Sequence, residues 1–126
     1  MKRTLMQVYV KGSVEAVRFY QKAFDAQLVV AYTNDDGTYG HAELDVDGQI
    51  LAIAEDDAVL STGNTMQFCL HFEHDEKDKV TKAYDVLTQG AVKLFGPLGP
   101  CPFSPHQASL VDKYGVSCAF FLTDAM

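Results

Sequence analysis

The secondary-structure elements predicted for this chain follow one another in the same order twice. In the first half, strands are expected at 3–10, 27–33, 39–46 and 49–54, with a helix after the first strand. In the second half, strands are expected at 65–72, 91–95, 108–112 and 116–123, again with a helix after the first. Each half therefore reads β-α-β-β-β, and this duplication restricts the available folds more than any other feature.

Short pieces of sequence repeat at the same interval. The Met-Gln of 6–7 recurs at 66–67, and the Lys-Ala-Phe-Asp of 22–25 recurs as Lys-Ala-Tyr-Asp at 82–85. Both matches are offset by sixty positions. Such short matches carry less weight than the order of elements, but they agree with it.

Two stretches are expected to lack regular structure. Residues 55–64 are acidic and then small and polar, which predicts a single domain with module 1 at 1–57, a linker at 58–64 and module 2 at 65–126. The stretch 96–107 holds all four prolines and two glycines, so it is predicted to be a long loop.

Both predicted helices carry an apolar stripe with helical spacing. Ser13 is the expected N-cap of the first helix, and Gly90 is the expected stop after the second, which begins near Asp75. The stripes are Val17, Tyr20 and Phe24 in the first helix, and Val80, Ala83, Tyr84 and Leu87 in the second. These residues are predicted to form core.

The stretch 65–72 alternates strictly between apolar and polar side chains, as expected of a strand with one face against the core. Its apolar face is Met66, Phe68, Leu70 and Phe72, and its polar face is Gln67, Cys69 and His71. The first strand divides similarly into Met6, Val8 and Val10 against Leu5, Gln7 and Tyr9. Each polar face is either a ligand-binding surface or an ordinary solvent-exposed surface.

Charge and cysteine content narrow the class of protein. The net charge of −7 argues against a nucleic-acid partner, which would require a face of Lys and Arg. Cys69, Cys101 and Cys118 form neither a metal-binding spacing nor a disulfide framework, which favours a reducing cytoplasm. No apolar run approaches the roughly 18 residues of a membrane span, so no membrane partner is expected.

Three motifs resemble one known family. They are Val-Glu-Ala-Val-Arg-Phe-Tyr-Gln-Lys-Ala-Phe at 14–24, His-Ala-Glu-Leu-Asp-Val-Asp-Gly-Gln-Ile-Leu at 41–51 and Asp-Lys-Tyr-Gly-Val at 112–116. In this order the chain resembles the vicinal oxygen chelate superfamily of glyoxalases, bleomycin-resistance proteins and extradiol dioxygenases, and within it the PhnB-like subgroup. The resemblance implies an α+β fold in which tandem β-α-β-β-β modules form a curved mixed sheet around a cleft, with helices outside. It also implies a homodimer.

Catalytic members of that superfamily bind a divalent metal through His, Gln or Glu side chains on four strands. The resemblance places these ligands at Leu5 or Gln7, and at Ala52, Gln67 and Ala119. Alanine cannot bind a metal and glutamine is a weak ligand, so no metal cofactor is expected. The alternative is a divalent metal at a relocated site drawn from His41, His71, Glu43 and Glu55.

The leading hypothesis is therefore a cytoplasmic, homodimeric, glyoxalase-like protein that binds a small molecule without a metal. The residues expected to line its cleft are Gln7, Tyr9, His41, Gln67, Cys69, His71 and Phe121. His41 is preferred among the histidines because it lies in the second motif. Cys69 and His71 share a strand face, but no third group is evident to make them a nucleophile and base. The alternatives are a metal-dependent lyase, isomerase or dioxygenase and an antibiotic-sequestering resistance protein.

Overall fold

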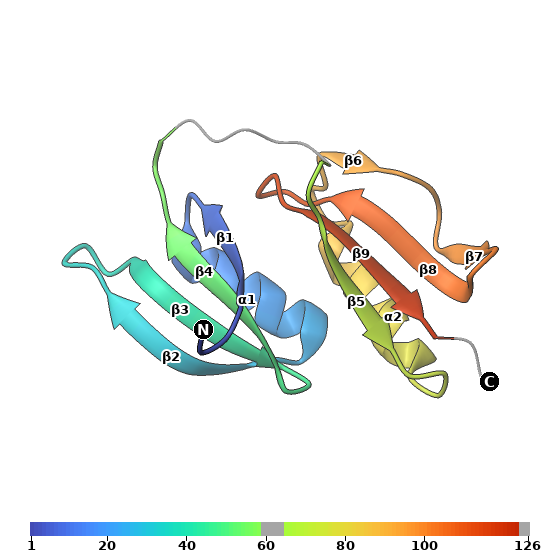
Figure 1. Cartoon of the computed structure of the whole chain (residues 1–126). Helices are drawn as coiled ribbons and strands as arrows, with labels where there is room; N and C mark the ends of the chain where they lie inside the picture. The colour runs from blue at the N-terminus through green and yellow to red at the C-terminus, as the bar shows by residue number, and fades with distance from the viewer. Residues whose placement is uncertain (59–64, 124–126) are drawn as a thin grey trace. The chain divides into compact units, whose positions relative to one another are not determined.

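The computed structural model describes residues 1–58 and 65–123 and shows two compact units, Met1–Leu60 and Ser61–Met126 (Figure 1). Each unit contains one helix and one mixed sheet, which confirms the α+β class. The first unit follows the predicted β-α-β-β-β order, and the second adds one short strand to it. Nearly all of the predicted linker 58–64 lies outside the described residues.

In the first unit, helix α1 (Ser13–Phe24) covers one face of a four-stranded sheet (Figure 1). The strands lie in the order β1-β4-β3-β2, where β1 pairs parallel with β4 and the other neighbours are antiparallel. Their bounds are Met6–Val10 for β1, Gln27–Thr33 for β2, Tyr39–Val46 for β3 and Gln49–Glu55 for β4. The four predicted strands are confirmed, although the first is shorter than 3–10.

The core of the first unit lies between α1 and this sheet. Leu51 of β4 is paired with Leu44 of β3. Both leucines are fully buried, and so is Tyr20 of the predicted helical stripe. The rings of Tyr20 and Phe24 stack with their centroids 6.2 Å apart. Because side chains alternate along a strand, the neighbouring positions must point to the opposite face.

The N-terminus of α1 differs from the prediction, since Ser13 is not its N-cap. Gly12 occupies the N-cap position with φ +89°. It has no side chain, so the N-cap residue itself cannot supply a capping hydrogen bond. The Glu55 carboxylate, at the end of β4, instead accepts hydrogen bonds from the backbone N–H groups of Gly12 (2.9 Å) and Ser13 (2.8 Å). Ser13 is buried, and its hydroxyl accepts the Tyr39 N–H at 2.9 Å. Burial acts to raise the pKa of Glu55, but these N–H groups lower it overall.

In the second unit, helix α2 (Lys77–Leu87) covers one face of a five-stranded sheet (Figure 1). The order is β5-β9-β8-β6, with β7 also paired to β8, and β5 runs parallel to β9. The bounds are Phe68–Phe72 for β5, Lys93–Leu94 for β6, Gly99–Cys101 for β7, Ser104–Val111 for β8 and Ser117–Leu122 for β9. Neither α1, with 12 residues, nor α2, with 11, could cross a membrane, and the described residues contain no other helix.

The prediction of a long loop at 96–107 is wrong, because much of this stretch forms a hairpin of β7 and the start of β8. Gly99 pairs with Gln107 and Cys101 with Ser104. Proline is tolerated on a short edge strand and near a strand end, where its missing N–H breaks no ladder. The buried Ser104 hydroxyl secures the hairpin by donating to the Leu122 carbonyl at 2.7 Å.

The start of β5 differs from the prediction, whereas the turn before β9 agrees with it. Met66 is almost fully exposed and precedes β5, so the strand predicted at 65–72 begins only at Phe68. The turn before β9 forms as its motif indicates. The buried Asp112 carboxylate accepts the backbone N–H groups of Tyr114 (2.9 Å) and Val116 (3.1 Å), and so holds the turn in place.

Candidate functional site

The sheet face away from α1 carries the polar residues predicted for the first unit. Gln7 of β1 is paired with Ala52 of β4, which is paired in turn with Glu43 of β3. Tyr9 and His41 each lie two residues from a member of this row, so they share its face. The strand order thus brings Gln7, Tyr9 and His41 to one surface.

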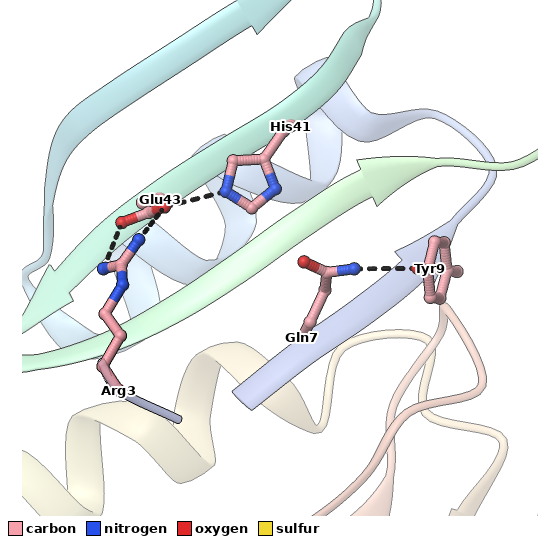
Figure 2. A network of polar contacts seen from close by, with 5 residues as sticks. All are labelled: Arg3, Gln7, Tyr9, His41 and Glu43. Atoms are coloured by element: carbon pink, nitrogen blue, oxygen red, sulfur yellow. Dashed lines mark hydrogen bonds and ion pairs between the residues drawn. The ribbon is translucent and has the colours of Figure 1, made fainter. Parts of the chain in front are cut away.

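An ion-pair network occupies the β3 side of this surface (Figure 2). Arg3 Nη1 donates to Glu43 Oε1 at 3.0 Å, and Arg3 Nη2 donates to Glu43 Oε2 at 2.9 Å. His41 Nε2 lies 2.8 Å from Glu43 Oε2. The Glu43 side chain is 5% exposed and that of Arg3 is 49% exposed, so Arg3 connects a buried carboxylate with solvent.

The network sets the charge of Glu43. The hydrogen bonds from Arg3, and after them the bond from His41, lower the pKa of Glu43 from its ordinary 4.5 to about 2. Glu43 is therefore ionised at neutral pH. A buried carboxylate is costly unless it is paired and hydrogen-bonded, and Arg3 supplies both forms of compensation.

The β1 side of the same surface is more exposed. Gln7 Nε2 donates to the Tyr9 hydroxyl at 2.8 Å, and more than half of the Tyr9 surface is accessible (Figure 2). On the other side, the Tyr32 ring of β2 lies 6.4 Å from the His41 ring. An amide, two phenols and an imidazole can therefore offer both hydrogen bonds and aromatic contact.

The sheet face away from α2 carries the second group of predicted residues. Gln67, Cys69 and His71 are all exposed. Gln67 Nε2 donates to the hydroxyls of Ser109 on β8 and Ser117 on β9, both at 3.3 Å. The Cys69 thiol donates a long bond of 3.8 Å to Gln67 Oε1. The described residues show no hydrogen bond between Cys69 and His71, so a nucleophile–base pair finds no support.

An aromatic cluster lies on the same face of the second unit. His71 of β5 is paired with Phe121 of β9, and their ring centroids are 5.1 Å apart. Phe103, at the tip of the β7–β8 hairpin, places its ring 5.2 Å from Phe121 and remains 66% exposed. The cluster provides an apolar surface on which a planar ligand can stack.

Cys118 is the most buried thiol of the second unit, and it cannot contribute to this face. It points toward the core from β9 and is fully buried. Burial, and after it the charge of Asp112, raises the pKa of the Cys118 thiol well above its ordinary value. A thiol held protonated in this way is neither a nucleophile nor a metal ligand.

The resemblance predicts metal-ligand positions at Ala52 and Ala119, and these residues do not fit a divalent ion. Ala52 and Ala119 are fully buried and offer no donor atom. The β5–β9 register sets Ala119 beside Cys69 rather than beside Gln67. In the part of the chain that the structure describes, no group of three or more His, Cys, Asp or Glu side chains converges as a metal site.

The four residues considered for a relocated site are not all available. His41 and Glu43 do meet, but Glu43 is already bound by the two terminal guanidinium nitrogens of Arg3. Glu55 binds the N-terminus of α1. His71 belongs to the other unit, where its ring contacts Phe121.

Arg3, Ser109, Ser117 and Phe103 were not among the predicted site residues. Arg3 lies before β1, so the alternation that places Gln7 and Tyr9 on one face does not extend to it. Alternation along the last strand does place Ser117 on the same face as Phe121, whereas the contact of Gln67 with Ser109 required knowledge of the strand order. Phe103 was hidden in a stretch predicted to be a loop.

Comparisons with known proteins agree with this architecture. The model of the Glyoxalase/Bleomycin resistance protein/Dioxygenase superfamily matches residues 4–120. The comparison with curated protein sequences found no significant match.

Solved structures show the same fold over nearly the whole chain. A PhnB protein from Bacillus cereus, named as a 3-demethylubiquinone-9 3-methyltransferase, is 26% identical with a TM-score of 0.80, covering 97% of this chain and 100% of that one. PA1353 from Pseudomonas aeruginosa is 16% identical with a TM-score of 0.75, covering 99% and 100%. The fosfomycin resistance protein FosX from Listeria monocytogenes is 14% identical with a TM-score of 0.70, covering 98% and 94%. From the family match and its own element order, the chain belongs to the Glyoxalase/Bleomycin resistance protein/Dioxygenase superfamily.

Proposed function

We propose that this protein binds a small, partly aromatic molecule without the help of a divalent metal. The observation that carries the proposal is the identity of the buried residues on β4 and β9. Where catalytic relatives are expected to place metal ligands, this chain has Ala52 and Ala119. The polar groups nearby are committed to one another instead, as in the Arg3–Glu43 pair.

The binding chemistry of the first unit is proposed to lie on both sides of β4. Ala52 and Ala54 separate Gln7 and Tyr9 on β1 from His41 on β3. Since neighbouring strands are about 4.8 Å apart, β1 and β3 are separated by about 10 Å, comparable with a small molecule. Gln7, Tyr9 and His41 would then contact its polar groups.

In the second unit, the proposed contacts combine amide and aromatic groups. Gln67 offers a carbonyl oxygen, and Cys69 adds a small polarisable surface beside it. His71 and Phe121 form a stacking surface to which Phe103 adds a third ring. Convergent amides among aromatic rings are typical of small-molecule sites.

Metal analysis tests the metal-free part of the proposal. The purified protein should contain no stoichiometric ion, and titration with zinc, nickel and manganese should give no saturable binding. His41→Ala is the informative variant and His74→Ala, which removes an exposed histidine, is its control. A stoichiometric ion that is lost in His41→Ala and kept in His74→Ala would refute the proposal.

A screen of small aromatic and amphipathic fragments by two-dimensional NMR tests the binding part. Binding should shift the signals of Gln7, Tyr9 or His41, or those of Gln67, His71 or Phe121. Shifts confined to the helix side of either sheet would contradict the proposed faces.

We also propose that the protein is a homodimer. The described chain exposes large apolar side chains in both units, including Val29 and Tyr32 on edge strand β2, and such surface commonly marks an interface. Sedimentation equilibrium should give twice the 13.9 kDa chain mass. A single species of the chain mass at all concentrations would contradict it.

A further inference from the structure

Glu43 determines which ring nitrogen of His41 carries hydrogen. An ionised carboxylate can only accept hydrogen bonds, and the low pKa of Glu43 keeps it ionised at neutral pH. The 2.8 Å contact between Glu43 Oε2 and His41 Nε2 therefore requires the hydrogen on Nε2. A neutral imidazole protonated at Nε2 carries a lone pair on Nδ1.

This second nitrogen is available to another molecule. Among the described residues, no hydrogen-bond partner of His41 Nδ1 is present, and 28% of the side chain is exposed. Figure 2 shows this nitrogen on the side of the ring away from Glu43. It faces the same surface as Gln7 and Tyr9, which belong to the proposed binding face.

We infer that Glu43 is a positioning residue that holds His41 as its Nε2–H tautomer, so that Nδ1 accepts a hydrogen bond from a hydroxyl or N–H of the ligand. The inference rests on the proposed function, since it names the kind of ligand group that the face receives. Such a ligand presents a donor such as a phenolic or enolic hydroxyl next to an apolar ring.

Arg3 completes the arrangement by balancing charge. The groups in contact with His41 are Glu43 on its own strand and the Tyr32 ring on β2, and Arg3, from the segment before β1, binds the same Glu43 carboxylate. The positive charge of Arg3 offsets the negative charge of Glu43, so the ion pair beside the imidazole carries no net charge. A neutral donor is therefore favoured over a cationic ligand, which an unpaired Glu43 would attract.

The tautomer can be observed directly by NMR. Long-range ¹H–¹⁵N correlation of the histidine rings, recorded at alkaline pH, separates protonated from unprotonated ring nitrogens. The unaltered protein should show hydrogen on Nε2 and none on Nδ1. Glu43→Gln should lose this preference, whereas Asp45→Asn, the same change on the same strand, should keep it. Hydrogen on Nδ1 in the unaltered protein would overturn the inference without any variant.

Phenol and anisole test the acceptor role as a matched pair, because only phenol can donate a hydrogen bond. Phenol should shift the Nδ1 signal of His41 and anisole should not. If both probes or neither shifts it, the inferred acceptor role is wrong. These readouts are independent of metal titration, so the metal-free proposal can fail or stand separately.

Discussion

Glu43 carries its charge on an interior strand with 4% of its surface exposed. Arg3, and after it His41, lower its pKa to about 2, below the ordinary 4.5 of an unfolded chain. Between these values the unfolded state binds more protons than the native state. The stabilisation is therefore complete above about pH 4.5 and is lost as the pH falls toward 2.

The Glu43→Gln variant tests this dependence through urea unfolding at pH 7, 5 and 3. The difference in free energy of unfolding between the unaltered protein and the variant should be nearly the same at pH 7 and pH 5 and should be smaller at pH 3. Glu73→Gln, at an exposed position, controls for loss of one negative charge. An equal difference at all three pH values would show that the Arg3 contact does not depend on the charge of Glu43.

Part of this site could be predicted from alternation alone. Alternation placed Gln7 and Tyr9 on one face of their strand, and the strand register brings His41 to the same face of the sheet. The partners of Glu43 could not be assigned in the same way, because the Arg3–Glu43 bond joins residues forty positions apart. Such contacts depend on strand order, which local patterns do not specify.

Glu55 connects two secondary-structure elements, because it lies at the end of β4 and binds the start of α1. Its carboxylate satisfies two of the N–H groups that a helix N-terminus leaves unpaired, and its charge suits the helix dipole. Glu55→Ala should lower the free energy of unfolding by about 1 kcal/mol, as for loss of a typical N-cap. Glu55→Gln, which keeps an acceptor, should cost less.

Urea unfolding monitored by circular dichroism gives both values, and Ser13→Ala makes a useful comparison. Ser13 was the predicted cap, but its hydroxyl bonds Tyr39 N–H in β3. If loss of Ser13 destabilised the protein and loss of Glu55 did not, the assignment of the cap would be wrong.

The elements themselves were predictable where their apolar period was regular. Strands β2, β3 and β4 occur at or within one residue of their predicted bounds, because each alternates and ends at a turn. The β7–β8 hairpin was missed because the prolines and glycines of 96–107 are typical of a loop, and the strand pairing could not be known from the sequence. Its prolines lie where the ladder needs no N–H, and this becomes evident only once β8 is seen to pair with β9 on its other side.

For the molecule as a whole, the duplicated plan implies two cores of the same kind, one in each unit. Each consists of one helix packed on one face of a mixed sheet, and the buried positions are aliphatic or aromatic in both. The identity of the ligand is not contained in this plan, because the helix sides of the sheets determine the fold and the opposite sides carry the candidate contacts.

Two matched core truncations test whether both units need their own core. Leu44 on β3 and Leu110 on β8 are each fully buried in the central part of a sheet. Leu44→Ala and Leu110→Ala should each reduce the free energy of unfolding by roughly 2–5 kcal/mol, since each removes buried apolar surface and leaves a cavity. Lys22→Ala, at an exposed position of α1, should cost far less. Urea unfolding measures all three, and a near-neutral effect of either leucine truncation would mean that its unit lacks a packed core.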